Sequence, residues 1–110
     1  MRVRLNDAEH DSGLRKLGSL IGAHAKTGIG TLLPTGGVVG TGANLFGGGR
    51  FAPKSVPAFG WWDGERMAEH RLEGFTRTAR TTMSRRSEQT GPSDEEAWAR
   101  LFESTRSERA

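Results

Sequence analysis

The sequence predicts a mainly β fold, in which a short parallel β-helix of hexapeptide repeats is followed by two C-terminal α-helices. Residues 21–49 repeat with a period of six, and from Asp63 onward apolar residues recur every three or four positions, as in amphipathic helices. Between these segments, Pro53 and Pro57 exclude a helix interior. We therefore divide the chain into β-helix coils at 3–49, a connector rich in proline and aromatic residues at 50–62, and a helical segment at 63–107.

The repeat of six lies in a segment whose only charged residue is Lys26. The first position of successive hexads is aliphatic or threonine, and the fifth position is small. The first positions are Ile21, Thr27, Leu33, Val39 and Leu45. A single rung cannot bury its apolar residue, so the first position is expected to stack on its counterpart three hexads away. This predicts that Ile21, Val39 and Leu45 are buried; a glycine-rich loop with accidental spacing is the alternative.

The segments on either side of the repeat are less regular. Residues 3–20 fit one degenerate coil, because Val3-Arg4-Leu5 alternates like a strand and Asn6-Asp7 is a turn signal. The connector spaces out four aromatic side chains, which are expected to cover the open end of the coils or to dock the helices onto them. These are Phe51, Phe59, Trp61 and Trp62. The alternative is that Trp61 and Trp62 form an exposed binding surface.

The helical segment is expected to hold two helices. Asp63 is the predicted N-cap of the first helix, which ends near Arg86. Its apolar face comprises Ala68, Leu72, Phe75, Ala79 and Met83. Gly91-Pro92 breaks the chain, and the capping-box pattern at 93–96 opens the second helix. Trp98, Leu101 and Phe102 are expected to face the first helix.

Composition excludes several classes of function. The 110 residues include no cysteine, which excludes disulfides and cysteine metal sites and suits a reducing cytoplasm. No apolar run approaches the roughly 20 residues that a membrane span requires. The net charge is +3, but residues 61–110 hold nine basic and ten acidic side chains that alternate. That alternation is typical of solvated helix faces, so neither a nucleic acid nor a membrane is predicted as a partner.

Among the residues that could perform chemistry, His24 and Lys26 are the candidates. Gly40-Thr-Gly42 is not completed to a dinucleotide-binding motif, because position 45 is leucine. His10, His24 and His70 are too far apart to suggest a metal pair, and His70 is expected on the surface of the first helix. His24 is a candidate general base, and Lys26 a candidate phosphate contact. The alternative is that both are ordinary solvent-facing residues.

The segment Arg15-Lys-Leu-Gly-Ser-Leu-Ile-Gly-Ala-His-Ala-Lys-Thr-Gly-Ile-Gly-Thr31, with its continuation to Trp61, resembles a known family. It is similar to the hexapeptide-repeat C-terminal domain of sugar-1-phosphate nucleotidyltransferases, in the group of the bifunctional uridyltransferase/acetyltransferases of N-acetylglucosamine 1-phosphate synthesis. The resemblance implies a left-handed β-helix, a homotrimer and acetyl-CoA as acyl donor. Ile29 stands where the acetyl-CoA-contacting serine of that group would align.

Two functions follow as expectations. The first is the C-terminal part of a sugar-phosphate nucleotidyltransferase/acyltransferase of nucleotide-sugar biosynthesis, with His24 as base and Lys26 as phosphate contact. The second is a non-catalytic trimerisation scaffold for a nucleotidyltransferase domain. The family's nucleotide-binding domain has no counterpart in the sequence. The chain is therefore expected to be a fragment that is weakly active or inactive alone.

Overall fold

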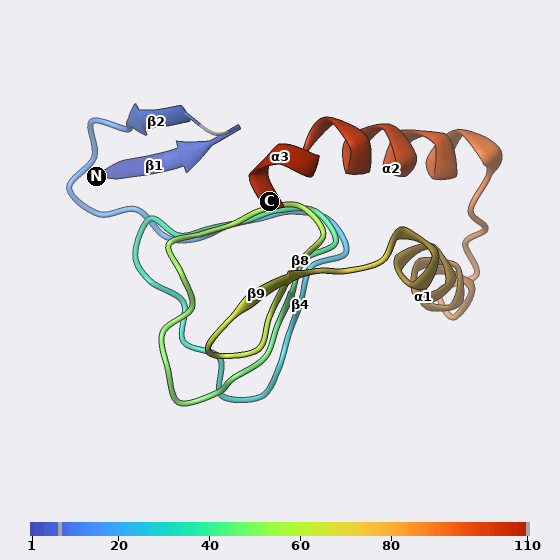
Figure 1. The fold of residues 1–110 in the computed structure, drawn as a ribbon, viewed down its shortest axis with the longest axis horizontal. Coiled ribbons are helices and arrows are strands. Elements are labelled where there is room, and N and C mark those ends of the chain that lie inside the picture. Colours follow the sequence, from blue (N-terminus) through green and yellow to red (C-terminus); the bar gives the residue numbers. More distant parts are fainter. Residues whose placement is uncertain (7, 110) are drawn as a thin grey trace.

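The computed structural model describes residues 1–6 and 8–109. Within these residues, nine short strands are followed by three helices (Figure 1). The strands are β1 (Arg2–Leu5), β2 (Ala8–Asp11), β3 (Leu20–Ile21), β4 (Lys26–Thr27), β5 (Val38–Val39), β6 (Asn44–Leu45), β7 (Ser55–Val56), β8 (Gly60–Trp62) and β9 (Met67–Glu69). The helices are α1 (Leu72–Ser84), α2 (Pro92–Ser104) and α3 (Arg106–Arg109).

Successive passes of the chain between residues 20 and 62 lie over one another, as Figure 1 shows. One parallel sheet has the order β3-β5-β7, and a second sheet has the order β4-β6-β8-β9. Ile21 pairs with Val39, and Thr27 pairs with Leu45, which are first positions of hexads eighteen residues apart. The period of six therefore sets the register of these pairs. In the described chain, β3 and β4 are edge strands.

The predicted fold class, a mainly β, left-handed parallel β-helix over residues 3–49, is wrong. The helices contain more residues than the strands, because α1 and α2 each span 13 residues and most strands span two. The expected first coil is instead an antiparallel hairpin of β1 and β2, and β9 runs antiparallel to β8. The β3-β5-β7 sheet and the sheet of β4, β6 and β8 form two sides of the stacked passes. On the third side, the described residues form one isolated bridge, between Leu32 and Phe51, rather than a ladder. Too few repeats are present to propagate a continuous coil, so separate sheets of two, three and four strands form.

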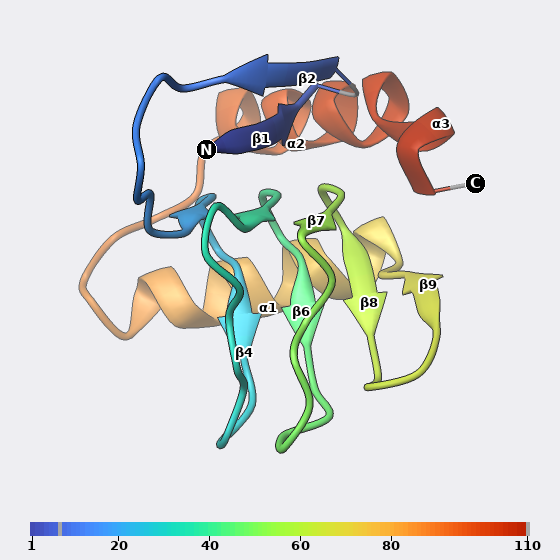
Figure 2. The same ribbon diagram turned by 90° about the vertical axis from the view of Figure 1, so that its left-hand side faces the viewer.

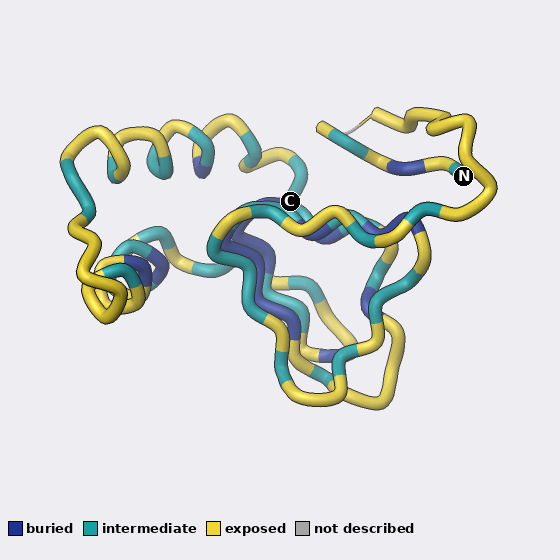
Figure 3. The backbone as a smooth tube through the Cα atoms, turned by 180° about the vertical axis from the view of Figure 1, so that it is seen from behind, coloured by how far each residue is buried: buried dark blue, intermediate teal, exposed yellow. Residues whose placement is uncertain are grey.

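The first hydrophobic core lies between the β3-β5-β7 sheet and the parallel strands of the β4-β6-β8-β9 sheet. It consists of Val39, Ala43, Leu45, Ala52 and Val56. In Figure 3, the buried stretches of the backbone (dark blue) lie along the stacked passes. Val39 and Leu45 are buried as predicted, but Ile21 is 54% exposed. Ile21 belongs to edge strand β3, where no further strand covers its side chain.

The first helix begins later than the sequence predicts. The Asp63 carboxylate Oδ1 accepts the backbone N–H groups of Glu65 (2.8 Å) and Arg66 (2.7 Å), so it stabilises the turn between β8 and β9 rather than a helix. Ala68 accordingly lies in β9, and α1 starts at Leu72. The expected connector at 50–62 contains strands β7 and β8.

The second helix is predicted more accurately than the first, although the capping box expected at 93–96 is wrong. The helix starts at Pro92 with Gly91 as its N-cap, and the Asp94 carboxylate accepts the Gly91 N–H at 2.9 Å. The short helix α3 was not predicted from the sequence.

A second core docks the helices onto the sheets. It consists of Ala58, Phe59, Phe75, Ala79 and Phe102, with Leu72, Trp98 and Leu101 packed against it. Helix α1 lies beside the sheet of β4, β6 and β8 in Figure 2. The prediction is confirmed for Leu72, Phe75 and Ala79 of the first helix and for Trp98, Leu101 and Phe102 of the second. It is wrong for Ala68, which lies in β9, and for Met83, which is not part of this core. No helix in the described part of the chain is long and apolar enough to span a bilayer.

Candidate functional site

His24 lies in the turn that joins β3 to β4, on the side that faces the helices. Its backbone has φ +58°, a left-handed conformation that few non-glycine residues adopt. The imidazole contacts two aromatic rings edge-on, with centroids 5.7 Å from Phe75 in α1 and 5.5 Å from Trp98 in α2. The predicted base is therefore held between the two helices rather than projecting freely into solvent.

Lys26 begins β4, two residues after His24, and is half-buried. Its Nζ donates a long hydrogen bond to the His24 carbonyl oxygen at 3.4 Å. No carboxylate in the described ranges forms an ion pair with Lys26. Burial lowers the pKa of the Lys26 ammonium from its ordinary value, because the charged form is partly desolvated.

His70 is a member of this site that the sequence did not indicate. It lies between β9 and α1 rather than on a helix surface, and its backbone N–H donates to the Phe59 carbonyl oxygen at 2.7 Å. Its ring is 5.1 Å from the ring of Trp61. Trp61 pairs with Asn44 in the parallel ladder, and Asn44 pairs with Lys26. The ladder thereby places His70 on the same face of the sheet as Lys26.

These three residues, His24, Lys26 and His70, form one electrostatic group that we call the basic cluster. Burial, and next the positive charge of Lys26, lower the pKa of both imidazoles from their ordinary value. Both effects disfavour the protonated imidazolium form of these rings. No described residue forms a hydrogen bond with a side-chain nitrogen of either histidine.

Within the described residues, no side chain forms a hydrogen bond that would orient the His24 imidazole. No described carboxylate orients the His24 imidazole, and no serine or cysteine pairs with it. His10 lies elsewhere, exposed on β2 and paired with Val3. No group of three or more metal-ligating side chains exists within residues 1–6 and 8–109.

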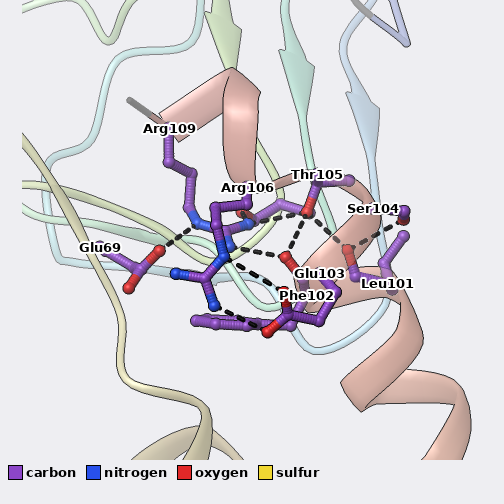
Figure 4. Close-up of polar contacts among 9 residues, drawn as sticks. Glu69, Leu101, Phe102, Glu103, Ser104, Thr105, Arg106 and Arg109 are labelled. Atoms are coloured by element: carbon purple, nitrogen blue, oxygen red, sulfur yellow. Dashed lines mark hydrogen bonds and ion pairs between the residues drawn. The ribbon is translucent and has the colours of Figure 1, made fainter.

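The densest polar network in the described chain surrounds Arg109 and is structural (Figure 4). The Arg109 guanidinium donates to Glu69 Oε2 at 2.8 Å, the Ala58 carbonyl at 3.0 Å, Thr105 Oγ1 at 2.7 Å and the Phe102 carbonyl at 2.7 Å. It also lies 4.2 Å from the centre of the Phe102 ring. Because its donors already have protein partners, this network leaves little capacity for a ligand.

A cavity of about 360 Å³ lies over the outer face of β3, β5 and β7. Leu20 and Val38 contribute to its floor, while Leu101 and Thr105 of the α2 end contribute to its wall. Neither His24 nor Lys26 lines this cavity. The two candidate residues from the sequence therefore lie on a different side of the sheets from the cavity.

Comparison of the chain with models of protein families, with curated proteins and with solved structures found no match.

Proposed function

We propose that the chain is a non-catalytic assembly module of a sugar-phosphate nucleotidyltransferase, and that copies of it associate with one another. The link to nucleotidyltransferases rests on the resemblance of residues 15–61. The observation that supports assembly is an uncovered apolar side of the stacked passes.

The chain covers two sides of the stacked passes with its own elements and leaves the third side open. The outer face of the β3 sheet faces the β1 hairpin and the end of α2 across the cavity, and α1 packs beside the β4 sheet. On the third side, Leu32 pairs with Phe51, and these side chains are 40% and 67% exposed. Ile29, in the preceding turn, is fully exposed. We call Ile29, Leu32 and Phe51 the uncovered side.

Exposed apolar side chains that share one face are typical of protein–protein contacts. Most soluble oligomers are symmetric assemblies of identical chains, so a second copy is the proposed occupant of the uncovered side. The resemblance implies three copies in the assembly. Association through this side buries Leu32 and Phe51 without disturbing the helices.

The arrangement around His24 favours the scaffold over acyl transfer. An acyltransferase needs a base within hydrogen-bond reach of its acceptor and oriented for it. The His24 ring contacts Phe75 and Trp98 and has no orienting carboxylate among the described residues. The acetyltransferase alternative therefore has only the resemblance to support it.

Sedimentation velocity at micromolar concentration tests the assembly. We expect the wild-type chain to sediment as a trimer and the Phe51→Ser variant to dissociate. Ile21→Ser is the matched control, because it removes an exposed apolar side chain from the open edge instead of the uncovered side. A wild-type particle of about 12 kDa (the chain itself is 11.9 kDa) contradicts assembly. If only the Ile21→Ser variant dissociates, the contact between copies lies at edge strand β3 and not at the uncovered side.

An activity assay tests the non-catalytic part of the proposal. The purified chain is incubated with acetyl-CoA and glucosamine 1-phosphate while free CoA is followed. No turnover is expected. Turnover that disappears in His24→Ala would replace the scaffold by an acetyltransferase with His24 as its base.

A further inference from the structure

The basic cluster presents hydrogen-bond donors that the protein itself does not use. Within the described chain, Lys26 has one long hydrogen bond, to a carbonyl, and the imidazoles of His24 and His70 have no hydrogen-bond partner. Every described side-chain nitrogen or oxygen that is fully buried has a partner. The donors of the cluster therefore reach the surface, where a ligand can contact them.

The charges of the cluster are also unbalanced. Lys26 is half-buried, and no carboxylate in the described part is paired with it, so the protein does not neutralise its charge by an ion pair. Glu69, the last residue of β9 and a neighbour of His70 in sequence, is ion-paired with Arg109 at 2.8 Å. The nearest acidic residue in sequence is thus already engaged.

The surroundings of the cluster add apolar walls. Phe75 lies edge-on to His24 and to His70, at centroid distances of 5.7 and 6.3 Å. The Trp61 ring contacts the rings of His70 and Phe46 in tilted arrangements, at centroid distances of 5.1 and 5.2 Å. Such walls lower the local dielectric constant and strengthen the attraction between an ammonium group and an anion.

We propose that the basic cluster binds a phosphate monoester, with the Lys26 ammonium supplying the charge and the His24 and His70 imidazoles supplying N–H donors. A phosphate group has several acceptor oxygens and about two negative charges at neutral pH, so its number of acceptors and its charge match a lysine ammonium and two imidazole N–H groups. This inference is independent of assembly, because the cluster lies on the α1 side and not on the uncovered side.

Histidine-detected NMR of the full chain tests the site. Inorganic phosphate is added at constant pH and ionic strength, and glucose 1-phosphate serves as the monoester probe. We expect the imidazole signals of His24 and His70 to shift saturably, while those of exposed His10 serve as internal reference. The bound dianion stabilises the imidazolium form, so the apparent pKa of His24 and of His70 should rise on binding.

Matched lysine variants make the test specific. Lys26→Gln is expected to weaken binding by about tenfold or more, because a charge-assisted hydrogen bond is lost. Lys16→Gln, at an exposed lysine between β2 and β3, is expected to leave binding unchanged. Lys26→Arg should retain binding, which separates loss of charge from any loss of folding in Lys26→Gln.

Three results would overturn the site. The first is that His24 and His70 respond no more than His10 does. The second is that Lys26→Gln, folded by circular dichroism, binds phosphate as tightly as the wild type. The third is that acetate binds as well as phosphate, which would exclude selectivity for phosphate monoesters.

Discussion

Arg109 Nε donates to Glu69 Oε2 at 2.8 Å and so joins α3 to β9 across forty residues of sequence. The two partners differ in environment. The Arg109 side chain is 2% exposed, whereas the Glu69 side chain is 39% exposed. Arg109 also donates to Ala58 and Phe102 carbonyls, so it fixes the α2–α3 end against the sheets.

Arg109→Ala is expected to lower the free energy of unfolding by about 2–4 kcal/mol. The substitution removes the Arg109 donor from the Ala58 carbonyl, leaves the Phe102 carbonyl only the long 3.5 Å bond from Thr105 Oγ1, and removes the stacking on Phe102. Glu69→Gln should cost less than about 1 kcal/mol, because its exposed carboxylate is largely screened by solvent. Urea denaturation measures both values. Equal midpoints for Arg109→Ala and wild type would show that the network contributes nothing to stability.

Gly42 is expected to tolerate no side chain. It has φ +70°, and a Cβ there would lie 2.8 Å from ring carbons of both Phe59 and Phe75. Gly13 has nearly the same φ, +72°, but its Cβ would meet nothing within 4 Å. Gly13→Ala therefore measures the backbone cost alone, about 1 kcal/mol. Gly42→Ala should cost about 1–3 kcal/mol more, from overpacking of the aromatic core.

Thermal denaturation of Gly13→Ala and Gly42→Ala shows whether the loss of stability in Gly42→Ala comes from the backbone conformation alone or also from overpacking. Equal losses of stability would mean that the contact of Phe59 with Phe75 adjusts freely around Gly42. In that case the aromatic core is not closely packed at this corner.

Stability is expected to decrease as the pH falls below about 6.5. The pKa of both His24 and His70 is lowered in the folded protein, so the unfolded chain binds more protons in this range. The stabilisation is therefore complete above the ordinary value of 6.5 and is lost as the pH falls from there through the lowered values. Asp63 and Glu103 titrate in a more acidic range, because their lowered pKa values start from 3.8 and 4.5.

Urea midpoints at pH 7.5 and 5.5, in buffer free of phosphate, test this dependence. The double variant His24→Gln/His70→Gln should remove most of the difference between the two midpoints. His10→Gln, on the exposed strand β2, should leave it unchanged. A wild-type midpoint that is the same at both pH values would contradict the expectation.

Val39→Asp is expected to abolish cooperative unfolding, because it places a charge at a site that is 4% exposed. Ile21→Asp, at the paired position of the adjacent strand, should be far milder, since Ile21 is 54% exposed. The slope and amplitude of the urea transition distinguish the two variants. A cooperative transition in Val39→Asp would show that the first core can admit solvent.

The sequence predicts local relationships well and fails where the outcome depends on distant contacts. The period of six correctly pairs Ile21 with Val39, but it cannot show that β3 is left as an edge strand with Ile21 exposed. Ala68 continues the helical spacing by coincidence. The pairing of Ala68 with Trp61 in β9 decides its structure instead.

In the candidate site, too, the sequence indicates the residues with a local signal and misses the one whose position depends on distant contacts. His24 and Lys26 are conspicuous because they are the basic residues in a nearly uncharged segment, and the structure places them side by side. His70 has no local signal, since its place depends on β9 pairing with β8 and on the contact between its ring and Trp61. Because β9 ends at Glu69 and α1 begins at Leu72, His70 lies directly after a strand of the sheet and not within a helix.

The separations between paired residues are not uniform along the stacked passes. Lys26 and Asn44 are eighteen residues apart, Leu32 and Phe51 nineteen, and Val38 and Ser55 seventeen. The differences arise in the corners, so the strands keep their alignment while the corners vary in length. Insertions or deletions during evolution are therefore tolerable at the corners. The same change within a strand would exchange inward-facing and outward-facing side chains along the rest of that strand.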